Sequence, residues 1–262
     1  MQLSLAMFET GAGTHVGNVR EHNEDRFLSK PQAGIWAVAD GMGGHEAGEL
    51  ASQTIVESLN AIEAPSSASE LLLQCEQQIV RANERLREVS RTRGGAVLGA
   101  TIALLLAYER HYACIWSGDS RIYVVRRGNI QQLSRDHTEV QQLLAQGAIT
   151  PEEAKNWPNS NVVTRAIGVF DSPELELSSG PLEPGDSFVV CSDGLTQHVS
   201  DEEILKQVSS HGSQQACDAL IALTLERGAR DNVTVIVVRY VPNVDGSGSP
   251  AASSADLWEA PR

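Results

Sequence analysis

The sequence predicts an α+β domain in which antiparallel sheets are covered by helices. Three observations support this: short apolar runs rich in β-branched and aromatic residues, very short gaps between three of these runs, and amphipathic helical patterns elsewhere. The gaps matter because a parallel crossover needs about a dozen residues, whereas ERH and SGDS leave room only for antiparallel turns. We therefore expect the three central strands to form consecutive hairpins.

The expected elements alternate along the chain. Strands are predicted over residues 34–39, 100–108, 112–118, 121–127, 187–192 and 233–240, with a further turn at RRGN that leads into IQQLS. Helices are predicted over 46–62, 71–89, 200–208 and 213–228. The third helix begins with a serine and acidic residues, and the fourth stops at Gly228, which are typical helix start and stop signals.

Residues 1–241 are expected to form one domain, followed by a tail. Signals weaken over residues 137–165, where we expect a short helix and an irregular loop that form a flap. Residues 242–262 are rich in Gly, Ser, Pro and Ala, which predicts a disordered C-terminal tail.

The composition excludes several classes of protein. The 262 residues carry 20 Lys and Arg against 34 Asp and Glu, so the formal charge of −14 disfavours nucleic acid and anionic membranes as partners. The N-terminus lacks a basic region, and the longest apolar run is far short of the roughly 20 residues that span a bilayer. We expect a cytoplasmic monomer.

Four widely spaced cysteines indicate free thiols rather than zinc ligands or disulfides: Cys75, Cys114, Cys191 and Cys217.

Aspartates stand at the ends of four predicted strands. They are Asp40, Asp119, Asp193 and Asp231, and three of them neighbour a glycine. An isolated Asp-Gly is usually only a turn. Strand ends of one sandwich lie close together, however, so the four acids could meet at one rim, where they would repel one another unless a cation neutralised them. An all-oxygen set of this kind suits Mg²⁺ or Mn²⁺ rather than zinc.

In the stretch AVADGMGGH, residues 37–45, three glycines follow an aspartate, and a metal site would account for this arrangement. Asp40 could bridge two ions through its two oxygens, and Gly41 could present its carbonyl because no side chain blocks the approach. The next glycines would let the chain turn sharply into the helix near Glu46.

A second polar group lies upstream in GNVREHNEDRF, residues 17–27. The plain interpretation is a loop closed by a surface ion pair. Beside a metal rim, the planar fork of Arg20 would instead match phosphate oxygens. Glu24 or Asp25 could then hold metal-bound water or orient a ligand.

Eight stretches together resemble the metal-dependent Ser/Thr protein phosphatases of the PP2C (PPM) type, in their compact bacterial form. They are VREHNEDRF, AVADGMGGHEAGE, GATIALLL, WSGDSRIY, LSRDHT, VVTRAIG, PGDSFVVCSDGLT and ARDNVTVIVV, in the family's order over about residues 10–240. The resemblance implies a four-layer αββα sandwich, with two antiparallel sheets packed face to face and helices on both outer faces. It also implies two Mn²⁺ or Mg²⁺ ions at one end, with a third, weaker ion in bacterial members.

The resemblance assigns roles to the strand-end acids. Asp40 resembles the ligand that bridges the two ions, and Gly41 the carbonyl ligand. Asp193 and Asp231 resemble ligands of the first metal. Asp119 resembles the residue that, with Asp193, holds the third ion.

The resemblance also assigns roles around the metals. Arg20 matches the phosphate-binding arginine, Asp25 an acid that supports the metal ligands, and Glu24 an acid that contacts metal-bound water. Some members place a histidine directly after the DG and use it as general acid. Here Met42 occupies that position, so His45 is either the proton donor or only a helix-start residue.

The implied activity is hydrolysis of phosphoserine and phosphothreonine in proteins by direct attack of a metal-bridging water, reversing a bacterial Ser/Thr kinase. GIWAVADGMGGH and ACIWSGDSR are also similar to phosphatases encoded with type VI secretion systems, which oppose a threonine kinase. Two alternatives stay open: a catalytically weak regulatory or binding module with the same fold, and a metal phosphodiesterase that acts on nucleotides. The retained acids disfavour the first, and the net charge disfavours the second.

Overall fold

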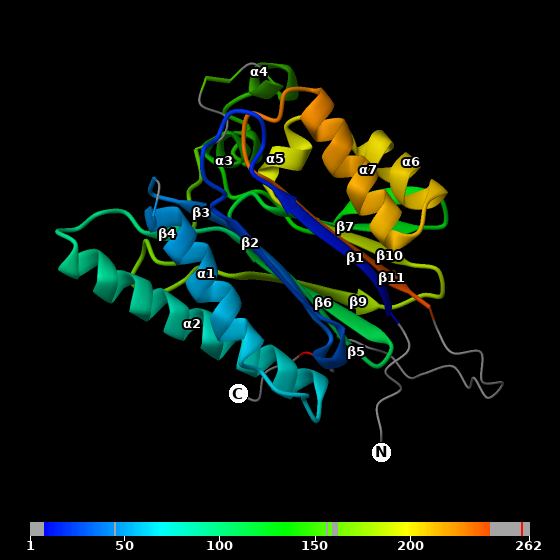
Figure 1. Cartoon of the computed structure of the whole chain (residues 1–262), viewed down its shortest axis with the longest axis horizontal. Coiled ribbons are helices and arrows are strands. Elements are labelled where there is room, and N and C mark those ends of the chain that lie inside the picture. Colours follow the sequence, from blue (N-terminus) through cyan, green and yellow to red (C-terminus); the bar gives the residue numbers. More distant parts are fainter. Residues whose placement is uncertain (1–7, 45, 156, 159–161, 242–257, 259–262) are drawn as a thin grey trace.

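Two antiparallel sheets form the centre of the protein in the computed structural model, which describes residues 8–44, 46–155, 157–158, 162–241 and 258. The first sheet has the strand order β1-β11-β10-β7-β8, and the second has the order β2-β3-β5-β6-β9, with β4 paired to β3 (Figure 1). The first sheet comprises β1 (Phe8–His15), β7 (Arg121–Arg126), β8 (Asn129–Gln132), β10 (Ser187–Cys191) and β11 (Val233–Tyr240). The second comprises β2 (Asp25–Lys30), β3 (Ile35–Met42), β4 (Gly99–Ala100), β5 (Ile102–Tyr108), β6 (His111–Ser117) and β9 (Glu176–Pro181).

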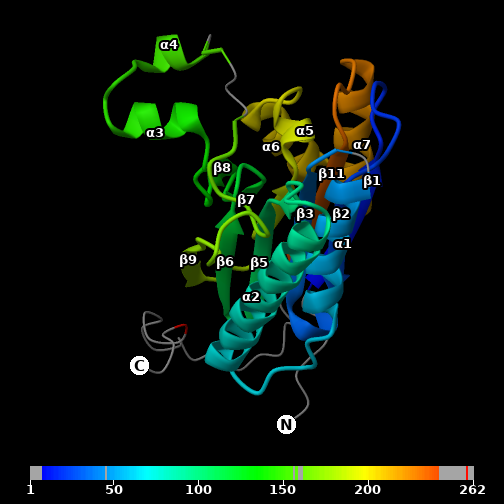
Figure 2. The same ribbon diagram turned by 90° about the vertical axis from the view of Figure 1, so that its left-hand side faces the viewer.

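Helices cover the outer face of each sheet, so the expected four-layer αββα sandwich is confirmed (Figures 1 and 2). The second sheet is covered by α1 (Glu46–Asn60) and α2 (Ala68–Thr92). The first sheet is covered by α5 (Asp193–Thr196), α6 (Asp201–Ser210) and α7 (Ser213–Glu226). A short 3₁₀ helix, η1 (Pro31–Ala33), links β2 to β3. Within the described residues, no helix combines the length and the apolar composition that crossing a bilayer requires.

Strand β11 illustrates how period-two patterning builds this core. Val235 and Val237 pack with the helices over the first sheet, whereas Ile236 and Val238 pack between the two sheets. Successive side chains of a strand point to opposite faces, so an unbroken apolar run fits a strand that is buried on both sides.

The prediction of three consecutive hairpins is wrong at one step. Strand β5 pairs with β6, and β7 pairs with β8, but β6 and β7 lie in different sheets. Gly118, at φ 116°, makes the turn between β6 and β7. A tight turn can carry the chain across to the facing sheet as well as back along the same one, and the gap length does not distinguish the two.

Three strands, β1, β2 and β9, were not predicted because their sequences are short of apolar residues. Glycines interrupt β1, and the packing explains one of them: a Cβ on Gly11 would lie 2.4 Å from backbone atoms of Ser213 and Gln214. The start of α7 therefore rests directly on the β1 backbone. Helix starts were easier to predict, since Ser200 and Glu203 form the expected capping box of α6.

The segment expected to be a flap contains two short helices, α3 (Glu139–Ala145) and α4 (Pro151–Lys155). Figure 2 shows them standing clear of the four layers, beyond β7 and β8. An isolated bridge between Thr138 and Val163 closes the base of the segment. Of the expected tail, only Trp258 lies within the described residues. It is 4% exposed and belongs to the core between the second sheet and its helices.

Candidate metal centre

Acidic residues from both sheets converge at one end of the sandwich, where the charges of four of them act on a fifth, Asp40. Asp25 and Asp40 are register partners on β2 and β3 of the second sheet. Asp193 begins α5, two residues after the end of β10 in the first sheet, and Asp231 lies two residues before β11. Asp119 lies in the turn that crosses from the second sheet to the first. The convergence thus depends on the two sheets being stacked.

Asp40 lies at the centre of this group. Burial raises the pKa of Asp40 well above its usual value, and the charges of the other four aspartates raise it further. Burial and the charge of Asp231 raise the pKa of Asp193, and contact with the Asp40 side chain offsets part of that rise.

Two further acids experience the same repulsion. Asp119 is 6% exposed, and burial together with the charge of Asp193 raises its pKa to about 8. Burial, followed by the charge of Asp231, raises the pKa of Asp193 to about 6. A bound divalent cation would relieve this repulsion and keep the acids ionised.

Asp25 connects the two sheets at the same end. Its Oδ2 accepts hydrogen bonds from Ser192 Oγ at 2.8 Å and from Thr234 Oγ1 at 2.7 Å; Ser192 directly follows β10 of the facing sheet, and Thr234 lies on its strand β11. Its Oδ1 is buried and has no hydrogen-bond partner within the described residues. Burial is the largest effect on Asp25 and raises its pKa to about 7. Sequence reasoning missed the two hydroxyl donors, although Ser192 stands directly before a singled-out Asp-Gly.

Gly41 is required by close packing. A Cβ on Gly41 would lie 2.2 Å from the Gly48 carbonyl oxygen and 2.8 Å from the Glu24 carbonyl oxygen. A Cβ on Gly48 would in turn lie 2.8 Å from the Glu24 carboxyl group. The start of α1, the end of β3 and the segment before β2 therefore meet with no room for a side chain. Helix α1 begins at Glu46, where the sequence predicted it.

Arg20 lies against the acidic group from the solvent side. Its Nη2 donates to Asp231 Oδ2 at 2.7 Å, and this hydrogen bond is the main reason that the pKa of Arg20 is raised. The side chain stays 53% exposed, so its guanidinium is accessible to an incoming anion.

Asn232 positions the loop that carries Arg20. Its Nδ2 donates to the carbonyl oxygens of Val16 and His22 at 2.8 and 2.9 Å, and its Oδ1 accepts from the Glu24 backbone N–H at 2.8 Å. Sequence reasoning missed Asn232. The available signal was its place in ARDN, directly after Asp231.

The donor set fits a hard divalent cation, because it offers only oxygens, is largely buried and is electrostatically unfavourable without positive charge. In the described part of the chain, however, no three His, Cys, Asp or Glu side chains already form a closed metal site. Two of the acids instead face protein groups: Asp231 faces Arg20, and Asp193 Oδ2 accepts from Gln197 Nε2 at 2.5 Å. A bound ion would compete with Arg20 and Gln197 for these two carboxylates. His45, the candidate general acid, lies outside the described residues.

Comparison with known families and proteins adds independent information. Residues 9–233 match the family described as protein phosphatase 2C. The chain is 34% identical over 240 residues to the serine/threonine protein phosphatase PstP of Mycobacterium tuberculosis, covering 91% of this chain but 46% of that protein. It thus spans about half the length of this relative. It is 33% identical over 238 residues to the serine/threonine phosphatase stp of Listeria welshimeri, covering 86% of this chain and 93% of the Listeria protein.

Solved structures give a similar result. PppA of Pseudomonas aeruginosa, described as a key regulatory component of the type VI secretion system, superposes with a TM-score of 0.83 at 42% identity, covering 90% of this chain and 98% of PppA. The catalytic domain of PstP in complex with two manganese ions superposes with a TM-score of 0.81 at 33% identity, covering 90% of this chain and 99% of that domain.

Proposed function

The chain belongs to the protein phosphatase 2C family, and on this premise we propose that it is a metal-dependent phosphatase that hydrolyses phosphoserine and phosphothreonine esters in proteins. One observation carries the proposal: five buried or half-buried aspartates converge at one end of the sandwich beside an accessible arginine, and burial with mutual repulsion raises the pKa of four of them, Asp25, Asp40, Asp119 and Asp193. Such a group is costly to maintain in a protein of marginal stability unless it binds something positively charged.

We assign the ligands from this arrangement. Asp40, Asp193 and Asp231, with the carbonyl of Gly41, would hold two ions of Mn²⁺ or Mg²⁺. Asp119, with Asp193, would hold a third ion. When bound, such ions would supply the Lewis-acid chemistry that activates water for attack on phosphorus and offsets the charge of the phosphoryl oxygens.

The remaining residues act on the substrate and on the ligands. The exposed guanidinium of Arg20 would bind two phosphoryl oxygens of the substrate. Asp25 fixes the spacing of the two sheets through Ser192 and Thr234, so it would position the ligands on both sides. Glu24 lies against Gly48 and would orient water beside the ions. His45 is retained as a candidate proton donor to the leaving group.

Several observations support the biological setting that we propose. Phosphorylated Ser/Thr proteins are the substrates, and a Ser/Thr kinase is the opposing enzyme. The 42% identity to PppA supports a role beside a type VI secretion system. The four cysteines are free and buried, which fits a reducing compartment such as the cytoplasm.

The test is turnover of p-nitrophenyl phosphate and of a phosphothreonine peptide across a Mn²⁺ titration. We compare wild type with the Asp193→Asn and Asp119→Asn variants, and use Asp218→Asn as a matched control, because Asp218 is an exposed acid on α7. We expect Asp193→Asn to lose nearly all activity, Asp119→Asn to lose part of it in a way that depends on Mn²⁺ concentration, and the control to resemble wild type.

Two results would contradict the proposal. Absence of turnover by wild type, with Mn²⁺ binding demonstrated by calorimetry, would identify a regulatory binding module. Faster turnover of bis-p-nitrophenyl phosphate than of the monoester would identify a phosphodiesterase.

A further inference from the structure

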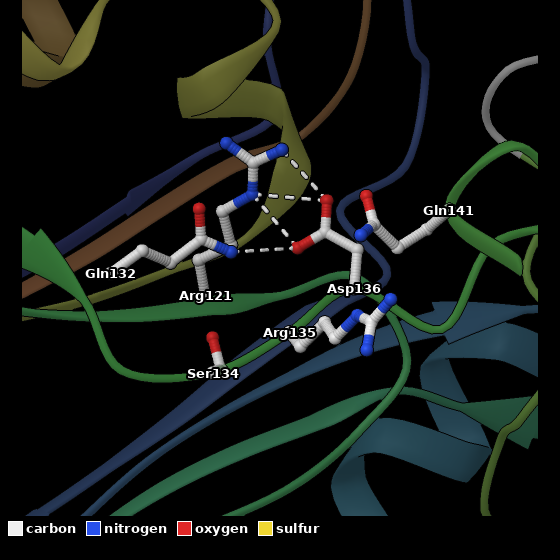
Figure 3. Close-up of a pocket in the computed structure, with 6 residues that line it drawn as sticks. All are labelled: Arg121, Gln132, Ser134, Arg135, Asp136 and Gln141. Carbon is white, nitrogen blue, oxygen red and sulfur yellow. Dashed lines mark hydrogen bonds and ion pairs between the residues drawn. The ribbon is translucent and has the colours of Figure 1, made fainter. Parts of the chain in front are cut away.

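A polar cavity of about 250 Å³ lies beside the acidic group, between β7, β8 and α3 (Figure 3). We call it the Arg135 pocket; it is lined by Arg121, Gln132, Ser134, Arg135, Asp136 and Gln141. A cavity of this size accommodates one charged side chain rather than a cofactor, since small-molecule sites are typically about 300–1,000 Å³.

The two arginines of the Arg135 pocket differ in what they bind. Arg121 is held by Asp136, with its Nε 2.9 and 3.1 Å from the two carboxylate oxygens and its Nη2 2.7 Å from Oδ2. Gln132 Nε2 also donates to Asp136 Oδ1, at 3.0 Å. The charge of Arg121 is therefore neutralised within the protein.

Arg135 is exposed, and its side chain makes no hydrogen bond or ion pair with any described residue. In Figure 3 its guanidinium points away from Arg121, on the side of Gln141. The Gln141 side chain, half-buried in the wall of the pocket, likewise has no partner among the described residues. The pocket thus offers one uncompensated positive charge and one amide.

The backbone of Arg135 is fixed relative to the acidic group. Its carbonyl oxygen accepts a hydrogen bond from Trp116 Nε1 at 2.8 Å. Two residues later, His137 forms a pair of hydrogen bonds with Gly118, from Gly118 N–H to His137 Nδ1 at 3.1 Å and from His137 N–H to the Gly118 carbonyl at 2.9 Å. Gly118 directly precedes Asp119. The charge of Asp136 also contributes to the raised pKa of Asp119, so the pocket and the acidic group lie within electrostatic reach of each other.

We propose that the Arg135 pocket binds an anionic side chain of the phosphoprotein substrate, close in sequence to the residue being dephosphorylated. A glutamate or aspartate carboxylate and a second phosphate share the required chemistry, because a guanidinium binds two oxygens of either group. The inference rests on the proposed function. In a chain with net charge −14, an exposed arginine without a described partner beside the acidic group favours an anion at one defined distance from the reacting phosphate.

The experiment measures kcat/KM on matched phosphothreonine peptides. One peptide has neutral flanking residues, a second set carries a single glutamate moved along about four positions on either side, and a third set carries phosphoserine instead. The proteins are wild type, Arg135→Ala, Arg135→Lys and the control Arg81→Ala, since Arg81 is an exposed arginine on α2, away from the pocket. p-Nitrophenyl phosphate serves as the substrate without flanking residues.

We expect wild type to favour an anion at one or two adjacent positions by about fivefold over the neutral peptide, in line with a partly exposed charge-assisted pair. Arg135→Ala removes this preference, Arg135→Lys keeps part of it, and Arg81→Ala keeps all of it. The preference should weaken in about 0.5 M salt. The glutamate and phosphoserine sets identify which anion is bound more strongly.

Three outcomes would overturn the inference: no position at which an anion is favoured, an unchanged preference in Arg135→Ala, or an equal loss on all peptides and on p-nitrophenyl phosphate. Each of them leaves wild-type turnover intact. Absence of turnover on every substrate would instead overturn the proposed function, so the two failures are distinguishable.

Discussion

Replacing Asp193 by asparagine should stabilise the metal-free protein while abolishing stabilisation by metal. The folded protein raises the pKa of Asp193 from 3.8 to about 6 through burial and the charge of Asp231. A group whose pKa is raised on folding adds no penalty below its unfolded pKa and the full penalty above its folded pKa. Stability attributable to Asp193 is therefore lost as pH rises from about 4 to about 6. Asparagine keeps the shape but carries no charge, so it removes this cost.

The magnitude follows from the two pKa values. Their difference, 6 − 3.8, at about 1.4 kcal/mol per pKa unit, corresponds to about 3 kcal/mol at pH 8 and about half of that at pH 5. In a domain of this size, about 1 kcal/mol changes Tm by about 2–4 °C. The aspartates repel one another, so their contributions to stability are not additive, and the variant should gain less than the full amount. We expect a rise in Tm of about 3–10 °C at pH 8.

Thermal and urea unfolding in EDTA and in MnCl₂, at pH 5 and pH 8, measure the effect. In EDTA, Asp193→Asn should unfold at a higher temperature than wild type, by more at pH 8 than at pH 5. Wild type should gain about 2.7 kcal/mol or more from Mn²⁺ at 100 times its dissociation constant, whereas the variant should gain little.

Asp218→Asn is the matched control, because it removes the same charge from the exposed face of α7 and should change neither result. Two results would refute the view that these aspartates repel one another: a lower Tm for Asp193→Asn than for wild type in EDTA at pH 8, or an equal rise in Tm at pH 5 and pH 8.

Three further predictions concern packing and substrate binding. Gly41→Ala should destabilise the protein by more than about 2 kcal/mol in urea unfolding, because its Cβ would lie 2.2 Å from the Gly48 carbonyl oxygen; a stable, active variant would contradict this. Arg20→Ala should lower kcat/KM about 10- to 100-fold and weaken inhibition by inorganic phosphate, and an unchanged inhibition constant would exclude Arg20 from phosphate binding. Trp258→Ala should lower the free energy of unfolding by about 3 kcal/mol, because the side chain is buried. Trp258→Phe should keep most of the wild-type stability, because the buried Nε1 has no described partner, and equal losses in the two variants would show that the ring is not packed in the core.

Local patterns predicted most of the elements that carry the site. The unbroken apolar run of β11 is sufficient to predict that strand, and the capping serine of α6 is sufficient to predict where that helix begins. Both signals are properties of a few consecutive residues. Strand β1 was missed for the opposite reason. Its glycine at position 11 accommodates α7, which lies about 200 residues away in sequence, and no local signal indicates that contact.

The residues of the candidate site likewise fall into those that the sequence indicated and those that it did not. The sequence indicated which acids would be important, since Asp40, Asp119 and Asp193 each follow an apolar strand. It did not indicate Asn232, Ser192 or Thr234, because an amide or a hydroxyl becomes significant only through the partner that it reaches, and those partners come from other strands.

By itself, then, the sequence determined most of the elements, the acidic residues at their ends and the family to which they belong, because these depend on residue type, order and spacing. Only the tertiary structure decided that β6 and β7 separate into facing sheets, that Asp25 joins those sheets, and that Arg121 is neutralised while Arg135 has no partner among the described residues. Those outcomes depend on which distant groups come within about 3 Å of one another, and hydrogen bonds and ion pairs are decided by that distance rather than by position along the chain.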